Sequence, residues 1–359
     1  TNVFQWTVNN GACASGVTSD QVTVVAYSSS NPAANAGPDQ ELCSNSSSTV
    51  MAGNAPIAPA VGTWSILLGS GTIVSPNSPT TAITGLAVGE NRFRWSMNNG
   101  PCPGSPSFDD VSIFVYDQNQ NAANAGADQQ LCTPVTSANL AGNAATFPAV
   151  GTWTLVSGSG TITNANSPTS TVTGLGVGNN VFAWTIDNGP CSNPITTDQV
   201  TITVFNASNP VANAGPDQQL CTPTLSTTLA GSATIFPATG AWTTSSGATI
   251  TAPGSPTTTV TGLSVGENIF TWTVSNGPCA SGITADQVSI FVYDANNAIA
   301  NAGPDQQLCT PNNNATMAAS SVTFPATGTW TIISGGGTIT DPNDPTTTIT
   351  AIPVGVNVF

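Results

Sequence analysis

Apolar and polar residues alternate with a period of two in several segments of this 359-residue chain. The pattern is clearest in residues 180–204, where Phe182, Trp184 and Ile186 alternate with small or polar residues. Such alternation predicts a β-strand, and a second alternating run ends at Val204. The Asn-Gly-Pro-Cys sequence between the two runs predicts a turn. No stretch has helical periodicity, so we predict an all-β chain.

The strand pair recurs roughly every 88–89 residues, and a period of this length suits one small β-sandwich domain. Each period also contains about five shorter strands with turn signals every 8 to 12 residues, as expected for an antiparallel sandwich. We therefore expect these domains: 1–28 (the last two strands of a repeat), 29–117, 118–206, 207–294 and 295–359 (the N-terminal part of a repeat). Short linkers rich in Asn, Ala and Pro favour an elongated rod of beads. Both ends divide a repeat, which suggests a window on a longer protein.

Charge is scarce and one-sided. Two arginines, no lysine and no histidine accompany 17 acidic residues, for a net charge of −15. This balance argues against nucleic acid and against an anionic membrane surface as partners. No apolar run is long enough for a membrane span, so this segment is not expected to be membrane-embedded. Without histidine or lysine the usual general bases and amine nucleophiles are absent, and we expect no enzyme and no catalytic residues.

Eight regularly spaced cysteines predict a disulfide framework and hence an exported protein. One pairing lies within repeats: Cys43–Cys102, Cys132–Cys191 and Cys221–Cys279, with Cys13 and Cys309 unpaired. The other crosses the linkers: Cys13–Cys43, Cys102–Cys132, Cys191–Cys221 and Cys279–Cys309. We favour the first, because a whole strand and a linker separate the cysteines of the second beyond disulfide reach. A metal site is not expected, since the chain has no CxxC motif and no histidine.

Tryptophans occupy two fixed places in the repeat. Those predicted on the third strand are Trp64, Trp153, Trp242 and Trp330, and those on the penultimate strand are Trp6, Trp95, Trp184 and Trp272. They could be platforms for sugar rings. Their register with inward apolar residues favours core positions instead.

Aspartates also recur at two places. They open the last strand (Asp20, Asp109, Asp198, Asp286) and the first strand (Asp39, Asp128, Asp217, Asp305). Calcium at the domain junctions is one interpretation, but two carboxylates are few for a calcium site. Capping of turns by Asp is the other, and we expect no cofactor.

Three motifs together suggest a family. They are Asn-Ala-Gly-Pro-Asp-Gln before Cys221, Ser-Gly-Ser-Gly-Thr-Ile-Thr after Trp153, and Trp-Thr-Ile-Asp-Asn-Gly-Pro-Cys at 184–191. The chain resembles the tandem PKD-like, immunoglobulin-like repeats of giant Bacteroidota cell-surface adhesins, including gliding-motility adhesins exported by type IX secretion. The resemblance implies an extracellular, cell-surface filament that contacts external surfaces or glycans, and filaments of this kind could bundle by self-association.

Two functions follow from that resemblance. The first is a structural and adhesive stalk segment that mediates surface attachment or gliding motility. The alternative is an array of weak glycan-binding modules acting through avidity. A repeated sugar site should repeat its contacts, yet the outward face of the penultimate strand carries Arg92 and Arg94 in one repeat and Val181 and Ala183 in the next. This variation favours the stalk.

Overall fold

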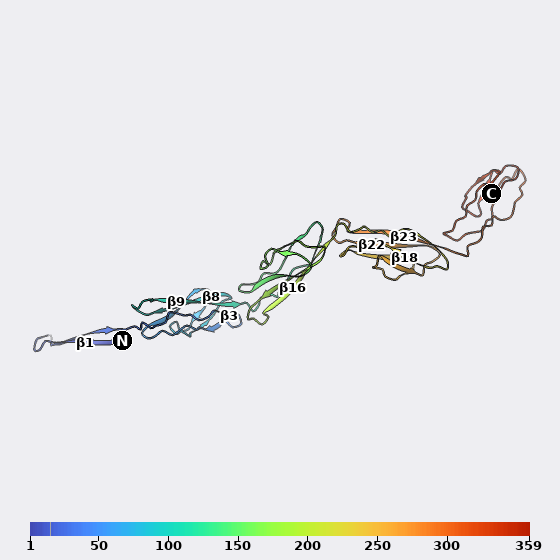
Figure 1. The fold of residues 1–359 in the computed structure, drawn as a ribbon. Coiled ribbons are helices and arrows are strands. Elements are labelled where there is room, and N and C mark those ends of the chain that lie inside the picture. The colour runs from blue at the N-terminus through green and yellow to red at the C-terminus, as the bar shows by residue number, and fades with distance from the viewer. Residues whose placement is uncertain (15) are drawn as a thin grey trace. The chain divides into compact units, whose positions relative to one another are not determined.

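The structure is a computed structural model that describes residues 1–14 and 16–359 (Figure 1). Every regular element among these residues is a β-strand, which confirms the predicted all-β class. None of the described residues form a helix that could cross a membrane. By internal contacts the described chain divides into two compact units. One comprises Thr1–Gln129, Ser137–Leu175 and Asn180–Thr201, and the other comprises Gln130–Thr136, Gly176–Asn179 and Ile202–Phe359.

A four-stranded sheet with one strand order occurs in each of the repeats 29–117, 118–206 and 207–294, called here the first, second and third repeats. In spatial order the strands are β3 (Gln40–Cys43), β9 (Ser107–Tyr116), β8 (Gly89–Asn98) and β5 (Val61–Leu68); β10 (Gln129–Cys132), β16 (Ile195–Phe205), β15 (Gly178–Asp187) and β12 (Val150–Ser157); and β17 (Gln218–Cys221), β23 (Ile283–Tyr293), β22 (Gly266–Ser275) and β19 (Thr239–Thr244). Buried and more exposed residues alternate along the long strands β8, β9, β22 and β23, as predicted. Figure 1 labels these strands.

One strand of this sheet is parallel to its neighbour. Strand β3 runs parallel to β9 and places Cys43 opposite Tyr116, while β17 runs parallel to β23 and places Cys221 opposite Tyr293. The expected sandwich was antiparallel throughout, so this pair is a refinement. Its consequence is that the first-strand cysteine lies at the end of the sheet where the last strand leaves the repeat.

A three-stranded antiparallel sheet accompanies each of these sheets. Its strands in spatial order are β4 (Ser48–Val50), β7 (Ala82–Thr84) and β6 (Thr72–Ile73); β11 (Ser137–Asn139), β14 (Thr171–Thr173) and β13 (Thr161–Ile162); and β18 (Ser226–Ala230), β21 (Thr257–Thr261) and β20 (Thr249–Ile250). The central strands bury Ile83, Val172 and Val260.

A pair of tryptophans on neighbouring strands is the centre of each core. Trp153 on β12 lies opposite Trp184 on β15, with ring centroids 4.9 Å apart and planes tilted by 40°. The same pair occurs in the other two repeats: Trp64 with Trp95, and Trp242 with Trp272. All six side chains are at most 2% exposed, so they occupy core positions and cannot serve as sugar platforms.

A glycine makes room for the second indole of each pair. A Cβ atom added to Gly151 would lie 2.1 Å from the Trp184 ring, and Gly62 and Gly240 have the same relation to Trp95 and Trp272. The indole Nε1 of Trp184 donates to the carbonyl oxygen of Asn143 at 3.0 Å. A buried indole N–H needs such a partner. The site of the Trp184 ring is therefore defined both by the space over Gly151 and by this hydrogen bond.

The two end segments are simpler. Strands β1 (Asn2–Asn9) and β2 (Val17–Val24) form a hairpin, and residues 295–359 form a sheet of β24 (Ala315–Thr316), β26 (Thr348–Thr350) and β25 (Thr338–Ile339). Trp6 is 76% exposed and Trp330 is half-buried, which corrects the expectation that both are core residues. The hairpin is a sheet of its own among the described residues, and residues 327–333 form no strand around Trp330.

Candidate functional site: the junction between repeats

The Asn-Gly-Pro-Cys turn of the second repeat is the first component of the junction. It connects β15 to β16, and Gly189 at its centre has a φ of +54°, a left-handed conformation that favours glycine. The side chain of Asn188 is 5% exposed. Its Nδ2 donates to the carbonyl oxygen of Asp117 at 2.8 Å. The turn of one repeat therefore holds the chain where it leaves the preceding repeat.

Tyr116, the last residue of β9, covers this turn. A Cβ atom on Gly189 would lie 2.6 Å from the Tyr116 ring, so only glycine permits this contact. The Tyr116 hydroxyl donates to Glu41 at 3.2 Å. Burial raises the pKa of the Tyr116 hydroxyl, and the negative charge of Glu41 raises it further.

A disulfide closes the junction. Cys43 lies beside Tyr116 in the parallel pair, and it bonds to Cys191 of the turn with the two Cα atoms 5.0 Å apart. These cysteines are 148 positions apart in sequence. The bond therefore joins the first strand of one repeat to the turn between the last two strands of the next.

The junction between the second and third repeats has the same parts. Phe205 covers Gly277, and Asn276 Nδ2 donates to the carbonyl oxygen of Asn206 at 3.0 Å. Cys132 bonds to Cys279, with Cα atoms 5.2 Å apart and a sequence separation of 147. The arrangement is thus a property of the repeat and not of one site.

The hairpin and the first repeat meet in the same way without a disulfide. Tyr27 covers Gly100, and Asn99 Nδ2 donates to the carbonyl oxygen of Ser28 at 2.9 Å. Cys102 of this turn is a free thiol, and the other free cysteines among the described residues are Cys13, Cys221 and Cys309.

These bonds correct the expected disulfide pairing. We expected Cys43–Cys102, Cys132–Cys191 and Cys221–Cys279 within repeats, whereas Cys102 and Cys221 are free and the other four pair across repeats. The reason is the parallel first strand, which puts its cysteine at the exit of a repeat, next to the following repeat's turn. The bonded cysteines are 147 and 148 residues apart, about one period plus 59, and this regular spacing in the sequence is compatible with the observed pairing.

A further apolar contact adds to the first junction. Phe114 on the outer face of β9 meets Phe147 of the next repeat edge-to-face, with centroids 6.3 Å apart. Phe291 meets Phe324 in the same geometry at 6.5 Å. An edge-to-face ring pair of this kind contributes about 1 kcal/mol of stability beyond the contribution of the apolar area that it buries.

The recurring aspartates hold the linkers. Asp198 Oδ2 accepts from the Ala125 amide, and Asp128 Oδ1 accepts from the Thr201 amide, each at 2.8 Å. The same bonds recur at Asp109, Asp39, Asp286 and Asp217. No group of three or more His, Cys, Asp or Glu side chains within residues 1–14 and 16–359 could hold a metal ion. These carboxylates therefore cap backbone amides, which is the alternative to calcium binding.

The residues on the outward face of the penultimate strand differ from repeat to repeat. In the first repeat Arg94 pairs with Asp110 at 2.7 Å and lies 4.2 Å from the Phe108 ring centroid. The hydrogen bond from Arg94 lowers the pKa of Asp110. The second repeat has Ala183 at the place of Arg94. The arginine cluster is therefore a feature of one repeat, in contrast to the junction.

No protein-family model and no curated protein matches this chain. Among solved structures, the PKD domain of KIAA 1837 protein is 30% identical over 27% of this chain and 92% of its own length, with a TM-score of 0.21. Extracellular domains 3–5 of Drosophila OTK are 12% identical over 72% of this chain and 95% of theirs, with a TM-score of 0.31. Three immunoglobulin domains of titin are 11% identical, over 72% and 96%, with a TM-score of 0.35. The likeness concerns fold and carries no functional information.

Proposed function

We propose that this chain is a structural and adhesive stalk segment of a long extracellular, cell-surface filament, which serves surface attachment or gliding motility. The observation that carries the proposal is the pair of disulfides between successive repeats. Such bonds form and persist in oxidising compartments outside the cytosol. They serve a protein that must keep consecutive repeats together under tension.

The junction supports a mechanical role through its composition. The junctions before and after the second repeat each combine a disulfide, a buried asparagine and an aromatic ring over glycine. Asp109, Asp198 and Asp286 add hydrogen bonds to the linkers that precede the first, second and third repeats. The six tryptophans of the three repeats are buried and cannot serve as platforms for sugars, which supports the stalk over the glycan-binding array.

Single-molecule stretching tests the proposal. Cys43 and Cys279 are about 236 residues apart, but the shortest covalent route between them crosses both disulfides and only about 59 residues, from Cys191 back to Cys132. At about 3.5 Å per residue, the oxidised segment should extend to roughly 200 Å and the reduced segment to roughly 800 Å. Equal extension with and without reductant would contradict a covalently limited stalk.

A matched variant separates this arrangement from pairing within repeats, which would impose a similar limit. Replacing the free thiols in Cys102→Ser with Cys221→Ser should leave the extension of the oxidised chain unchanged. Pairing within repeats would lose two disulfides in this variant and lengthen the segment severalfold. A screen of the chain against immobilised glycans is the complementary test, and reproducible binding of one sugar class by every repeat would favour the glycan-binding array.

A further inference from the structure

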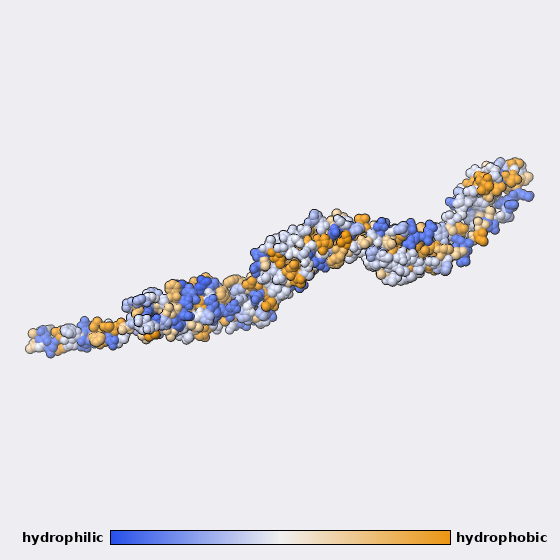
Figure 2. Space-filling model, viewed as in Figure 1, coloured by the Kyte–Doolittle hydropathy of each residue, from blue (hydrophilic) through white to orange (hydrophobic). Residues whose placement is uncertain are grey.

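The asparagine of each junction turn has a buried oxygen that the junction leaves unpaired. Asn188 and Asn276 each donate through Nδ2 to a linker carbonyl, but no described residue donates to the Oδ1 atom of either side chain. Asn99 of the first repeat has the same unpaired Oδ1 atom among the described residues. Polar and apolar residues are interspersed on the face of the chain drawn in Figure 2, whereas these three side chains are at most 9% exposed.

Glycine follows each of these asparagines, and an Asn-Gly pair can react with itself. The backbone nitrogen of Gly189 attacks Cγ of Asn188, and the new N–C bond closes a succinimide ring. The side-chain amide leaves as ammonia and takes the glycine N–H proton with it. Water then opens the ring at either carbonyl and gives aspartate or isoaspartate. The sequence needs no oxidant or reductant, and glycine favours it because no side chain hinders the attacking nitrogen.

The closed junction opposes this reaction. The Gly189 N–H donates to Asp187 Oδ1 at 3.0 Å, which engages the attacking group. Attack on Cγ places negative charge on Oδ1 and needs hydrogen-bond donors there, yet none of the residues that the structure describes donates to Asn188 Oδ1. The bond from Nδ2 to the Asp117 carbonyl holds the leaving amide at 2.8 Å, and the Tyr116 ring covers the glycine.

The product of the reaction does not fit the closed junction. An aspartate is ionised at neutral pH. At position 188 its carboxylate would face the Asp117 carbonyl oxygen that accepts from Nδ2 of the asparagine. An unpaired charge on a side chain that is only 5% exposed is strongly destabilising. Isoaspartate adds a methylene to the backbone beside Gly189, where even a Cβ atom would lie 2.6 Å from the Tyr116 ring.

We propose that the Asn-Gly turn of each junction is a modification site that becomes reactive when the junction opens. A closed junction protects the asparagine, while an open one allows its conversion to aspartate or isoaspartate, after which the junction no longer closes. A protected group reacts in proportion to the population of the locally open state. The disulfides Cys43–Cys191 and Cys132–Cys279 keep that population low at their own junctions. The proposal depends on the junction geometry and not on the stalk function.

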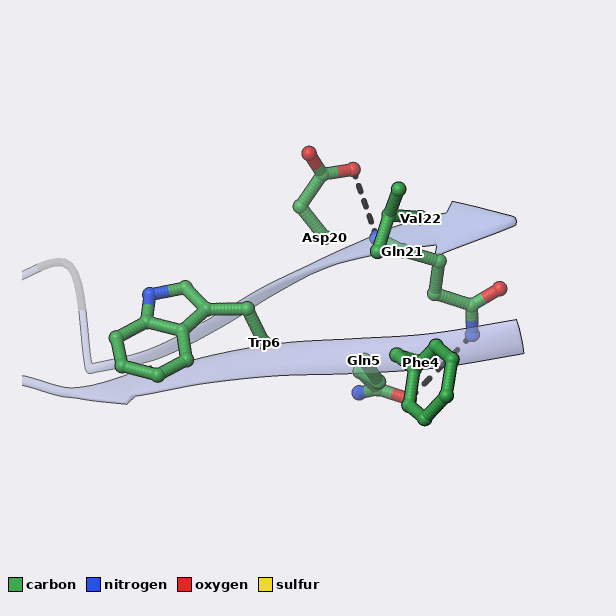
Figure 3. A pocket seen from close by; sticks show the side chains of 6 residues that line it. All are labelled: Phe4, Gln5, Trp6, Asp20, Gln21 and Val22. Carbon is green, nitrogen blue, oxygen red and sulfur yellow. Dashed lines mark hydrogen bonds between the residues drawn. The ribbon is translucent and has the colours of Figure 1, made fainter. Parts of the chain in front are cut away.

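The β1–β2 hairpin contains an exposed Asn-Gly turn that serves as an internal standard. Asn10 and Gly11 are exposed, and the Gly11 N–H donates to Asn9 Oδ1 at 2.9 Å, the same local bond as in the second repeat. Figure 3 shows the two strands of this hairpin, with Gln21 bonded to Gln5 across them. The turn therefore has the local hydrogen bond of a junction turn at an exposed position, and its rate of conversion is the reference for the protected sites.

The test is peptide mapping of the full 359-residue chain after incubation, oxidised and folded, at mildly alkaline pH. Cleavage before Asp reports the reaction, because each new aspartate is a new cleavage site and isoaspartate leaves the peptide whole with a higher mass. The peptides that contain the three sites are 1–19, 187–197 and 217–285. A sample digested at the start of the incubation gives the background.

We expect Asn10 to be converted in the folded chain while Asn188 and Asn276 remain amides. In denaturant with reductant all three should react at similar rates, because the junctions are then absent. Equal conversion of the three asparagines in the folded, oxidised chain would overturn the proposal.

Removal of one disulfide at a time shows whether the junction controls the reaction. Cys43→Ser with Cys191→Ser should speed the conversion of Asn188 about tenfold or more and leave that of Asn276 unchanged. The corresponding double variant of the Cys132–Cys279 bond should do the reverse, so each junction is the folding control for the other. Equal acceleration at both asparagines in either variant would contradict control by the junction.

Asn188→Asp makes the product directly and tests whether the modified junction closes. In this variant dithiothreitol should reduce the Cys43–Cys191 bond several-fold faster than in the parent, while the Cys132–Cys279 bond keeps the parent's rate. Unchanged reduction of Cys43–Cys191 would contradict the proposed loss of closure, and the stretching result for the stalk would still stand.

Discussion

The second repeat and residues 295–359 have closely similar sequences around their third-strand tryptophans but different structures. In the second repeat, residues 150–157 form β12 and Trp153 is 2% exposed. In the end segment, residues 327–333 form no strand and Trp330 is half-buried. What differs is the penultimate strand, which supplies Trp184 and its hydrogen bonds in the second repeat. A strand in this fold is thus determined by its partner more than by its own β-propensity.

Among substitutions that separate the second repeat from the end segments, removal of a disulfide should change the free energy of unfolding most. In Cys43→Ser with Cys191→Ser, the loss of a 148-residue loop closure should cost about 5 kcal/mol in the free energy of unfolding the junction. Urea unfolding followed by circular dichroism measures this cost. Cys13→Ser with Cys309→Ser, which alters only exposed thiols of the end segments, is the control and should change stability by less than about 0.5 kcal/mol at low protein concentration.

The next effect comes from the penultimate-strand indole. Trp184→Ala removes a fully buried ring and should destabilise the second repeat by about 3 to 5 kcal/mol. Trp6→Ala removes a ring that is 76% exposed and should be nearly neutral in the monomer. Thermal or urea unfolding of both variants at low protein concentration measures the two losses of stability. Similar losses in the two variants would mean that the hairpin indole is buried after all.

The smallest effect concerns pH at the junction. Burial raises the pKa of the Tyr116 hydroxyl in the folded chain. The folded state therefore favours the neutral phenol. Its contribution is fully present below the unfolded value of about 10 and is lost as pH rises through the folded value. The temperature at the midpoint of thermal unfolding should therefore decrease slightly as the pH is raised above 10. Tyr116→Phe should weaken that fall, and a variant with the same alkaline loss as the parent would show that another group is responsible.

Much of this architecture follows from sequence pattern. The alternation in residues 180–204, the Asn-Gly turn and the tryptophan positions predict the strand pair and its inward face. The division of the chain into domains stays a prediction. The partners of Cys43 and Cys191 were missed, because alternation does not reveal whether a short first strand such as β3 pairs in parallel or antiparallel. The exposure of Trp6 and Trp330 was missed for a related reason: burial depends on a second sheet or strand, which a local pattern does not report.

Peptide mapping under non-reducing conditions shows most directly whether disulfides join successive repeats. The chain has two arginines and no lysine, so cleavage before Asp is more useful than trypsin. We predict peptide 39–108 joined to 187–197, and 128–186 joined to 217–285. Peptide 128–186 joined instead to 187–197 would show that Cys132 bonds to Cys191 within one repeat and would contradict the account.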